Sequence, residues 1–188
     1  MATIAVYDAC VLYPAPLRDL LIRLAAAGVV RAYWTEDILD ECFEAILKRR
    51  PDLDEESLKR TRLLLNEALP GSSVTGHEKL ISSLTLPDPK DRHVLAAAIQ
   101  CRANAIVTMN LRDFPREALH RFSVLPVHPD QFIVQAIQVS PVTVGSIINQ
   151  QAAALSRPPM SVNALLNKLE ACGLHHSMTK CRKLLKIS

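Results

Sequence analysis

Five acidic residues at separated places in the sequence have the chemistry to bind a divalent metal ion together. They are Asp8, Glu41, Asp88, Asp91 and Asp113. Carboxylates that share one place repel one another unless a cation neutralises them. Hard oxygen ligands without a Cys or His partner favour Mg²⁺ or Mn²⁺ over zinc. A metal pair held by carboxylates can activate a water and stabilise the leaving oxygen when a phosphodiester is cleaved.

Two predicted strands explain how these side chains could meet. The alternating segment Thr3–Tyr7 predicts a strand that ends at Asp8, and the apolar segment Ala105–Val107 predicts a buried strand followed by Thr108 and Asn110. Ligands bind at the carboxyl ends of strands in open α/β sheets. We therefore expect the loops that carry Asp88, Asp91 and Asp113 to converge there as well.

Strand-like and helix-like segments alternate through the first 128 residues. Strands are predicted at 3–7, 29–34, 105–107 and 122–127, and helices after Pro16, after Thr35, after Asp54 and from Arg92. We expect a loop at residues 9–16, and a short strand within 72–86 is left open. This order predicts an α/β fold with a parallel sheet flanked by helices.

Beyond Pro129 the sequence shows only helical patterns. They cover 131–138, 142–155, 162–172 and 176–185. We interpret them as an all-helical C-terminal extension without a second catalytic unit. The predicted domains are therefore 1–128 and 129–188.

The composition limits the class of protein. The 188 residues suit one domain of ordinary size, and 49% of them are hydrophobic. No apolar run approaches the ~20 residues of a membrane-spanning helix, and the first residues lack the basic start of a signal peptide. The five cysteines are odd in number and lack zinc-site spacing. We therefore expect a cytoplasmic protein with no membrane association.

The charge is unevenly distributed, although the net charge is only +3. The residues from Ala118 onward hold two acidic and seven basic side chains, whereas the first 117 hold 17 acidic and 15 basic ones. A basic end beside an acidic site suits a nucleic-acid substrate. A solvated helical tail gives the same count, and both interpretations remain open.

Four stretches, in this order, resemble the PIN-domain ribonucleases and, among them, the VapC-type toxins of bacterial toxin–antitoxin pairs. The stretches are VYDACVLY (6–13), ILDE (38–41), DPKDRHVLAAA (88–98) and VTMNLRDFP (107–115). The resemblance covers roughly residues 1–128. It implies a PIN-like fold and a ribonuclease that depends on Mg²⁺ or Mn²⁺, with Asp8, Glu41 and Asp91 as metal-binding catalytic carboxylates. It also implies an antitoxin partner, and such toxins commonly form homodimers.

The fourth acidic position of the family departs from the usual pattern here. That position is commonly Asp, but this chain has Asn110, with Asp113 three residues later. Either Asp113 supplies the fourth acid or the site binds metal more weakly. Asp88 is a further acid that could act as an outer ligand. Thr108 could orient a ligand or simply end its strand.

Several other side chains could meet an RNA substrate. Arg18, Arg92 and Arg112 could contact phosphates or be ordinary surface charges. Tyr13 and Trp34 could stack on bases, although packing in the core or along a groove is the interpretation we favour.

The main hypothesis is a metal-dependent endoribonuclease toxin that hydrolyses RNA. The alternative is a catalytically weak PIN-fold module that binds RNA or protein, motivated by Asn110 and the basic helical end. A phosphotransferase with Asp8 as nucleophile is disfavoured, because no second Asp follows two residues later.

Overall fold

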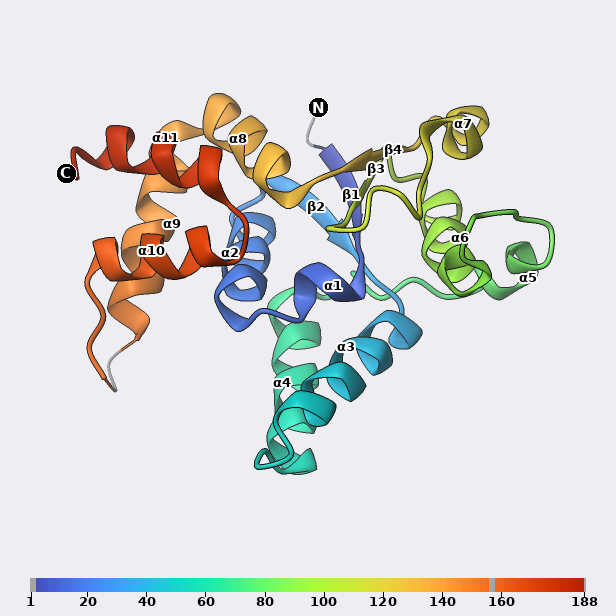
Figure 1. The fold of residues 1–188 in the computed structure, drawn as a ribbon, viewed down its shortest axis with the longest axis horizontal. Helices are drawn as coiled ribbons and strands as arrows, with labels where there is room; N and C mark the ends of the chain where they lie inside the picture. Colours follow the sequence, from blue (N-terminus) through green and yellow to red (C-terminus); the bar gives the residue numbers. More distant parts are fainter. Residues whose placement is uncertain (1–2, 156–157, 188) are drawn as a thin grey trace.

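The centre of the computed structural model, which describes residues 3–155 and 158–187, is a four-stranded parallel sheet (Figure 1). The strands are β1 (Thr3–Tyr7), β2 (Val30–Tyr33), β3 (Ala105–Val107) and β4 (Leu125–Val127). Their order is β2-β1-β3-β4, and each neighbouring pair is parallel. This arrangement confirms the predicted parallel sheet. It places β1 beside β3, so their carboxyl ends meet at Tyr7 and Val107.

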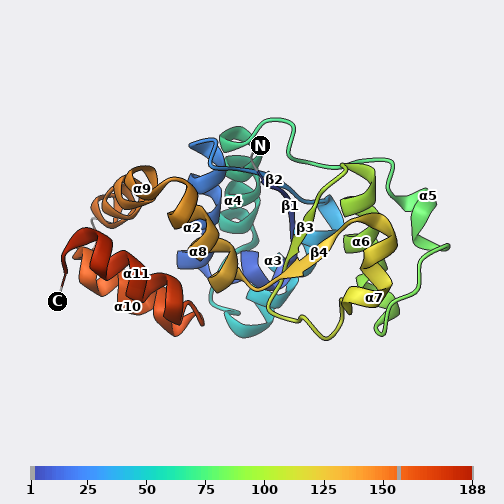
Figure 2. The ribbon, with the colours of Figure 1, turned by 90° about the horizontal axis from the view of Figure 1, so that it is seen from above.

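Helices flank this sheet, with α2 and α8 on one side and α6 on the other (Figure 2). The helices are α1 (Ala9–Leu12), α2 (Ala15–Ala26), α3 (Glu36–Arg49), α4 (Glu55–Ala68), α5 (Glu78–Ile81), α6 (Arg92–Gln100), α7 (Arg116–Leu119), α8 (Pro129–Val139), α9 (Pro141–Ala154), α10 (Val162–Ala171) and α11 (His175–Leu185). Short 3₁₀ turns occupy Pro89–Asp91 and His120–Phe122. The three alanines of α6, at positions 96–98, are fully buried, so this helix lies close against β1 and β3.

The predicted ends of the helices are confirmed where the sequence gives capping signals. The Thr35 hydroxyl accepts the backbone N–H of Ile38 at 3.1 Å, and Asp54 caps α4 in the same way. Gly28 ends the turn after α2 with a φ of +71°, a left-handed conformation that glycine adopts without strain.

Two local predictions differ from the structure, and the question left open at residues 72–86 is answered. The loop expected at residues 9–16 contains α1, because Val11 and Leu12 are buried and pull this segment onto the core. Residues 72–86 contain α5 and a single bridge from Ser73 to Trp34 in place of a strand. The last strand begins at Leu125, since a 3₁₀ turn occupies the preceding residues.

Helices α3 and α4 form an arm that projects from the body of the molecule (Figure 1). We call residues 36–68 the α3–α4 arm. Arg62 of α4 forms ion pairs with Glu36 and Asp40 of α3, and its guanidinium lies over the Phe43 ring. These contacts hold the two helices together beside the sheet.

The four C-terminal helices pack against the sheet domain through α8, α9 and α10. The Phe132 ring of α8 meets the Tyr7 ring of β1 edge-on, with ring centres 6.0 Å apart. The buried Gln151 of α9 donates a hydrogen bond of 2.9 Å to the Pro16 carbonyl. The C-terminal helices therefore share one core with the sheet, while the predicted boundary at residue 128 stays a prediction.

The end of the chain is fixed by one buried carboxylate. Asp130 of α8 accepts the backbone N–H groups of His176 and Ser177 at the start of α11, together with the Ser177 hydroxyl. Burial by itself would raise the pKa of Asp130, but these hydrogen bonds outweigh burial and hold its pKa below the usual value. Asp130 thus acts as a capping carboxylate for a helix that begins 45 residues later.

Within residues 3–155 and 158–187, no single helix has the length and apolar composition of a membrane span. The pair α8 and α9 meets these criteria only when the two helices are taken together, and it is bent by 119°.

Candidate active site

The site begins at Asp8, directly after β1. Its backbone N–H donates to the Val107 carbonyl at 3.1 Å, which extends the pairing of β1 and β3 by one residue. Asp8 is only 6% exposed, yet no basic side chain among the described residues pairs with it. Its Oδ2 accepts the hydroxyl of Thr108 at 2.7 Å, and Thr108 is fully buried at the end of β3. The two central strands therefore deliver the two side chains that meet.

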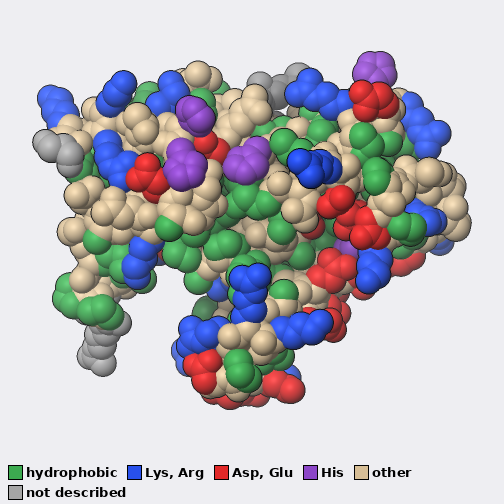
Figure 3. All heavy atoms as spheres, in the orientation of Figure 1, with side chains coloured by type: hydrophobic (Ala, Val, Ile, Leu, Met, Phe, Trp, Pro, Cys, Tyr) green, Lys and Arg blue, Asp and Glu red, His purple; other side chains and the backbone are tan. Residues whose placement is uncertain are grey.

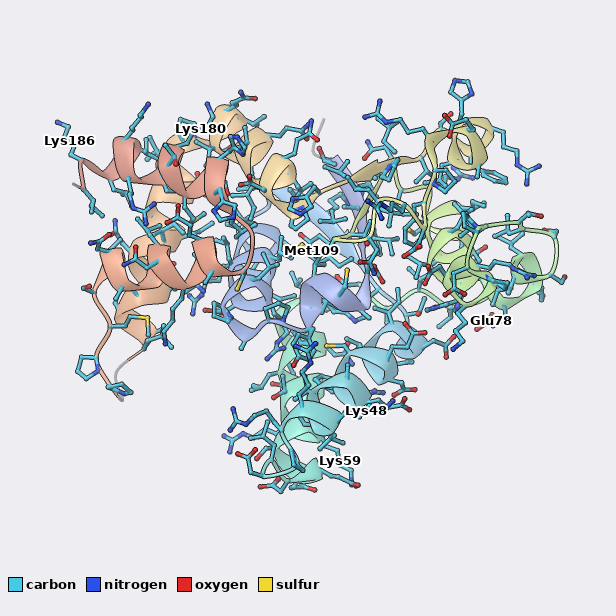
Figure 4. The ribbon with its side chains drawn as sticks, viewed as in Figure 1. Lys48, Lys59, Glu78, Met109, Lys180 and Lys186 are labelled. Carbon is cyan, nitrogen blue, oxygen red and sulfur yellow. The ribbon has the colours of Figure 1, made fainter. Side chains whose placement is uncertain are left out.

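Cys10 forms a third point of contact at this edge of the sheet. Its thiol donates to Asp8 Oδ2 at 3.0 Å and lies 3.4 Å from the Thr108 hydroxyl. The thiol sulfur also accepts the backbone N–H of Met109 at 3.2 Å, a residue labelled in Figure 4. Burial, followed by the charge of Asp8, raises the pKa of Cys10 to about 12. The thiol is therefore protonated at neutral pH and acts as a donor to Asp8.

Glu41 reaches the site from the second turn of α3. Its carboxylate lies 3.1 Å from Nε2 of His93, which is buried near the start of α6. Burial alone would lower the pKa of His93, but the bond and the charge of Glu41 outweigh burial and raise it. His93 therefore holds Glu41 between α3 and α6 and supplies positive charge when it is protonated.

Asp91 is surrounded by other acidic side chains. Burial raises the pKa of its carboxyl to about 6, with further contributions from the charges of Asp8, Asp113, Asp88 and Glu41. Its side chain makes no hydrogen bond as a helix cap, so capping does not explain its presence. The exposed Asp88 does have a local role, because its side chain accepts the Lys90 N–H at 2.9 Å.

The loop after β3 carries Asn110 and Asp113. The Asn110 N–H donates to the Thr108 hydroxyl at 3.0 Å, and its carbonyl accepts the Asp113 N–H at 3.0 Å. Asn110 is exposed, whereas Asp113 is half-buried. Of the two, Asp113 brings a negative charge that acts on Asp91.

Acidic side chains accordingly gather where the start of α3 faces α6 (Figure 3). No three His, Cys, Asp or Glu side chains in the described part of the chain lie close enough together to form a ready-made metal site. The donor set nevertheless fits a hard divalent cation, since it offers carboxylate oxygens with a protonated thiol beside them. Burial raises the pKa of Asp91 first, and the charges of four other carboxylates raise it further; a bound cation would neutralise those charges.

The three predicted RNA-contacting arginines lie in different surroundings. Arg18 donates to the backbone carbonyls of Leu12 and Tyr13, at 2.6 and 3.4 Å, which ties α2 to α1. Arg92 is half-buried, and its Nε has no hydrogen-bond partner among the described residues. Arg112 is exposed on the loop that also carries Asp113. Arg18 therefore has a structural task, and Arg112 is the one free to approach a ligand near the carboxylates.

Sequence reasoning missed two contributors, Cys10 and His93. Neither belongs to a ligand-spacing pattern, and each acts through a side chain from another element. Both lie within two residues of a predicted ligand, Asp8 and Asp91, which was the only available signal. The two aromatic residues considered for base stacking lie in different surroundings: Trp34 is buried in the core, whereas Tyr13 is half-exposed.

Comparisons with known proteins match both parts of the chain. A family model described as PIN domain matches residues 4–112, and one described as VapC50 C-terminal domain matches residues 129–183. The putative ribonuclease VapC50 of Mycobacterium tuberculosis (strain ATCC 25618 / H37Rv) is 36% identical over 94 residues. These residues are 50% of this chain and 55% of that protein, so the match spans about half the length of the relative. No solved structure matches.

Proposed function

Because the chain belongs to the PIN-domain family, we propose that it is a metal-dependent endoribonuclease that hydrolyses phosphodiester bonds of RNA. The observation that carries the proposal is the set of carboxylates around Asp91, whose charges add to burial in raising the pKa of that residue. The relative named as a putative ribonuclease supports RNA as the substrate. VapC-type toxins provide the biological context, so we propose that the chain is the toxin of a toxin–antitoxin pair.

The metal ligands in this proposal are Asp8, Glu41, Asp91 and Asp113. Asn110 and Asp88 are further candidates for the metal site, with Asp88 as an outer ligand. When bound, Mg²⁺ or Mn²⁺ would polarise a water and neutralise charge that develops on the scissile phosphate. We assign the fourth acidic role to Asp113, because its charge acts on Asp91 and Asn110 carries none.

The residues around the ligands have positioning roles. Thr108 and Cys10 donate to one oxygen of Asp8 and so leave its other oxygen, Oδ1, for a cation. His93 of α6 positions the carboxylate of Glu41, which comes from α3. Arg112, which is exposed on the loop that also carries Asp113, would contact an RNA phosphate.

A second candidate function is a PIN-fold module that binds RNA or protein with little catalysis. Asn110 favours it, since an uncharged amide replaces the usual acid on the loop after β3. The exposed Lys180 and Lys183 of α11 would supply positive charge for binding.

The proposed partners are an RNA substrate, a cognate antitoxin protein that covers the carboxylates of the candidate site, and a second copy of the chain in a homodimer. A cytoplasmic location is also part of the proposal. The unpaired state of all five cysteines supports a reducing compartment.

Incubation of the purified chain with total cellular RNA tests the proposed function. Discrete fragments that form with Mg²⁺ or Mn²⁺ and disappear with EDTA are the expected result. RNA that stays intact with metal, while it still binds the chain, would instead support the non-catalytic module.

A further inference from the structure

A pocket of about 310 Å³ lies between α1 and α3, beside the carboxylates. One wall comes from α1 and the residue after it, and the other comes from α3. The lining residues that matter here are Ala9, Cys10, Tyr13, Glu41, Ala45 and Arg49. We call this cavity the α1–α3 pocket. Its volume is at the lower end of the range for small-molecule sites.

The pocket opens directly onto the candidate active site. Cys10 lines it and also donates to Asp8, while Glu41 lines it and also pairs with His93. A molecule in the pocket therefore lies next to two of the carboxylates that would hold the metal.

The pocket runs along α3 because its lining residues form a stripe on this helix. Glu41, Ala45 and Arg49 are spaced four residues apart, which places them on one face. With a rise of 1.5 Å per residue, Arg49 is ~12 Å along the helix axis from Glu41. The small side chains of Ala45 and Ala9 leave open space between these ends.

The far end of the pocket has the features of a base-stacking site. The guanidinium of Arg49 lies over the ring of Tyr13, 5.5 Å from the ring centre. Tyr13 is half-exposed and Arg49 is exposed, and Arg49 has no ion pair with the described residues. Aromatic rings and arginine planes are the surfaces on which single-stranded bases stack.

We propose that the α1–α3 pocket binds one base of the RNA substrate, stacked on Tyr13 and contacted by Arg49, next to the scissile phosphate. The proposal rests on the proposed ribonuclease function, which places that phosphate at the carboxylates. Guanine is the expected base, because an arginine can donate two hydrogen bonds to its O6 and N7 atoms. Tyr13 and Arg49 are then specificity-determining residues.

A base explains these residues better than a side chain of a partner protein. A cationic side chain attracted by Glu41 would meet the positive charge of Arg49 at the other end. A nucleotide places its phosphate toward the metal site and its base toward the arginine, so each end of the pocket has a suitable group.

Binding of short single-stranded RNA to chains that carry Asp8→Asn measures the proposal without cleavage. The probe is an oligouridine with one guanosine, beside the same oligomer with an abasic site at that position. Tyr13→Leu is expected to weaken binding of the guanosine oligomer by roughly 5- to 100-fold, and Tyr13→Phe should retain most of the affinity. The abasic oligomer should be nearly insensitive to Tyr13→Leu.

A second variant guards against a folding defect at Tyr13. Arg49→Ala changes an exposed residue and should reduce the preference for guanosine over adenosine by about tenfold or more. Lys48→Ala is the matched control, because it removes the same charge from the adjacent exposed position of α3, labelled in Figure 4. That control should keep the preference intact.

The outcomes distinguish failure of the pocket proposal from failure of the proposed nuclease function. If the unaltered chain cuts RNA but Tyr13→Leu and Arg49→Ala leave affinity and base preference unchanged, the pocket proposal is overturned and the proposed function stands. The pocket proposal is also overturned if these variants weaken only the binding of a partner protein. If the unaltered chain cuts no RNA with metal, the proposed function fails, while the oligomer affinities still decide the pocket.

Discussion

The hydroxyl of Thr108 donates a hydrogen bond of 2.7 Å to Oδ2 of Asp8, 100 residues earlier in the chain. The same hydroxyl accepts the N–H of Asn110 at 3.0 Å. One buried side chain therefore joins the ends of β1 and β3 to the loop that carries Asn110 and Asp113. This link orients a carboxylate that would otherwise be buried with only the Cys10 thiol as a side-chain donor.

Thr108→Val should weaken the protein in two ways, because valine matches the shape of threonine but has no hydroxyl. Loss of a donor to a buried carboxylate costs ~1–3 kcal/mol of unfolding free energy. Misorientation of Asp8 should reduce metal affinity or RNA cleavage by about 10- to 100-fold. Thr108→Ser restores the hydroxyl and should recover most of both quantities. Wild-type cleavage by the valine variant would show that the hydroxyl has no positioning role.

Asp91→Asn should stabilise the metal-free chain, because it removes a charge that four other carboxylates repel. After solvent screening we expect on the order of 1 kcal/mol, or roughly 2–4 °C in melting temperature. Mn²⁺ should raise the melting temperature of the unaltered chain and have a much smaller effect on the variant. Thermal unfolding with EDTA and with Mn²⁺ measures both effects. An equal Mn²⁺ shift in the two chains would remove Asp91 from the ligand set.

Asp130→Asn should loosen α11, because Asp130 accepts hydrogen bonds from His176 and Ser177 at its start. The folded pKa of Asp130 lies below its unfolded value. Its contribution is therefore full above the unfolded pKa, about 4, and is lost as the pH falls through the folded pKa.

Thermal unfolding at several pH values checks this prediction. The free energy of unfolding of the unaltered chain should exceed that of Asp130→Asn by ~1–2 kcal/mol near pH 6. This difference should close on acidification below about pH 4. Asp52→Asn is the control, since Asp52 lies in an exposed pair with Arg50 and should change little. A gap that stays constant down to low pH would contradict the assignment.

Phe132→Ala should destabilise the sheet as well as the C-terminal helices, because Phe132 packs edge-on against Tyr7 of β1. A truncation at a buried phenylalanine costs ~3–5 kcal/mol. Hydrogen exchange of the β1 amides should become faster in the variant if the two parts share one core. Unchanged protection of β1, together with faster exchange in α8, would show that the extension folds independently.

The longer strands and helices could be predicted because their sequence signals are local. Alternation predicts β1, and helical spacing with caps such as Thr35 and Asp54 predicts α3 and α4. The short helix α1 was not predictable, since four residues are too few to show a helical period. The neighbouring prolines, Pro14 and Pro16, favoured a loop there.

Asp8 and Asp91 could be selected from the sequence because the first follows a strand and the second opens a helix, whereas Glu41, in the second turn of α3, has no such local signal. The surroundings of these carboxylates could not be predicted, because they depend on contacts between distant elements. The pairing of Glu41 with His93 joins α3 to α6 across 52 residues, and nothing local in the sequence specifies it. Arg18 was a candidate for RNA contact, yet two carbonyls near the end of α1 occupy its guanidinium.

The most direct test of the proposed metal site is the cleavage rate of one RNA at a mapped position, measured with Mn²⁺ and with EDTA. The unaltered chain should cut only with Mn²⁺, and Asp8→Asn should lose at least about 100-fold of that rate. Glu44→Gln removes one exposed charge from the same helix as Glu41 and should cut at nearly the unaltered rate. Cleavage by Asp8→Asn at the unaltered rate, or undiminished cleavage in EDTA, would contradict a metal site built on these carboxylates.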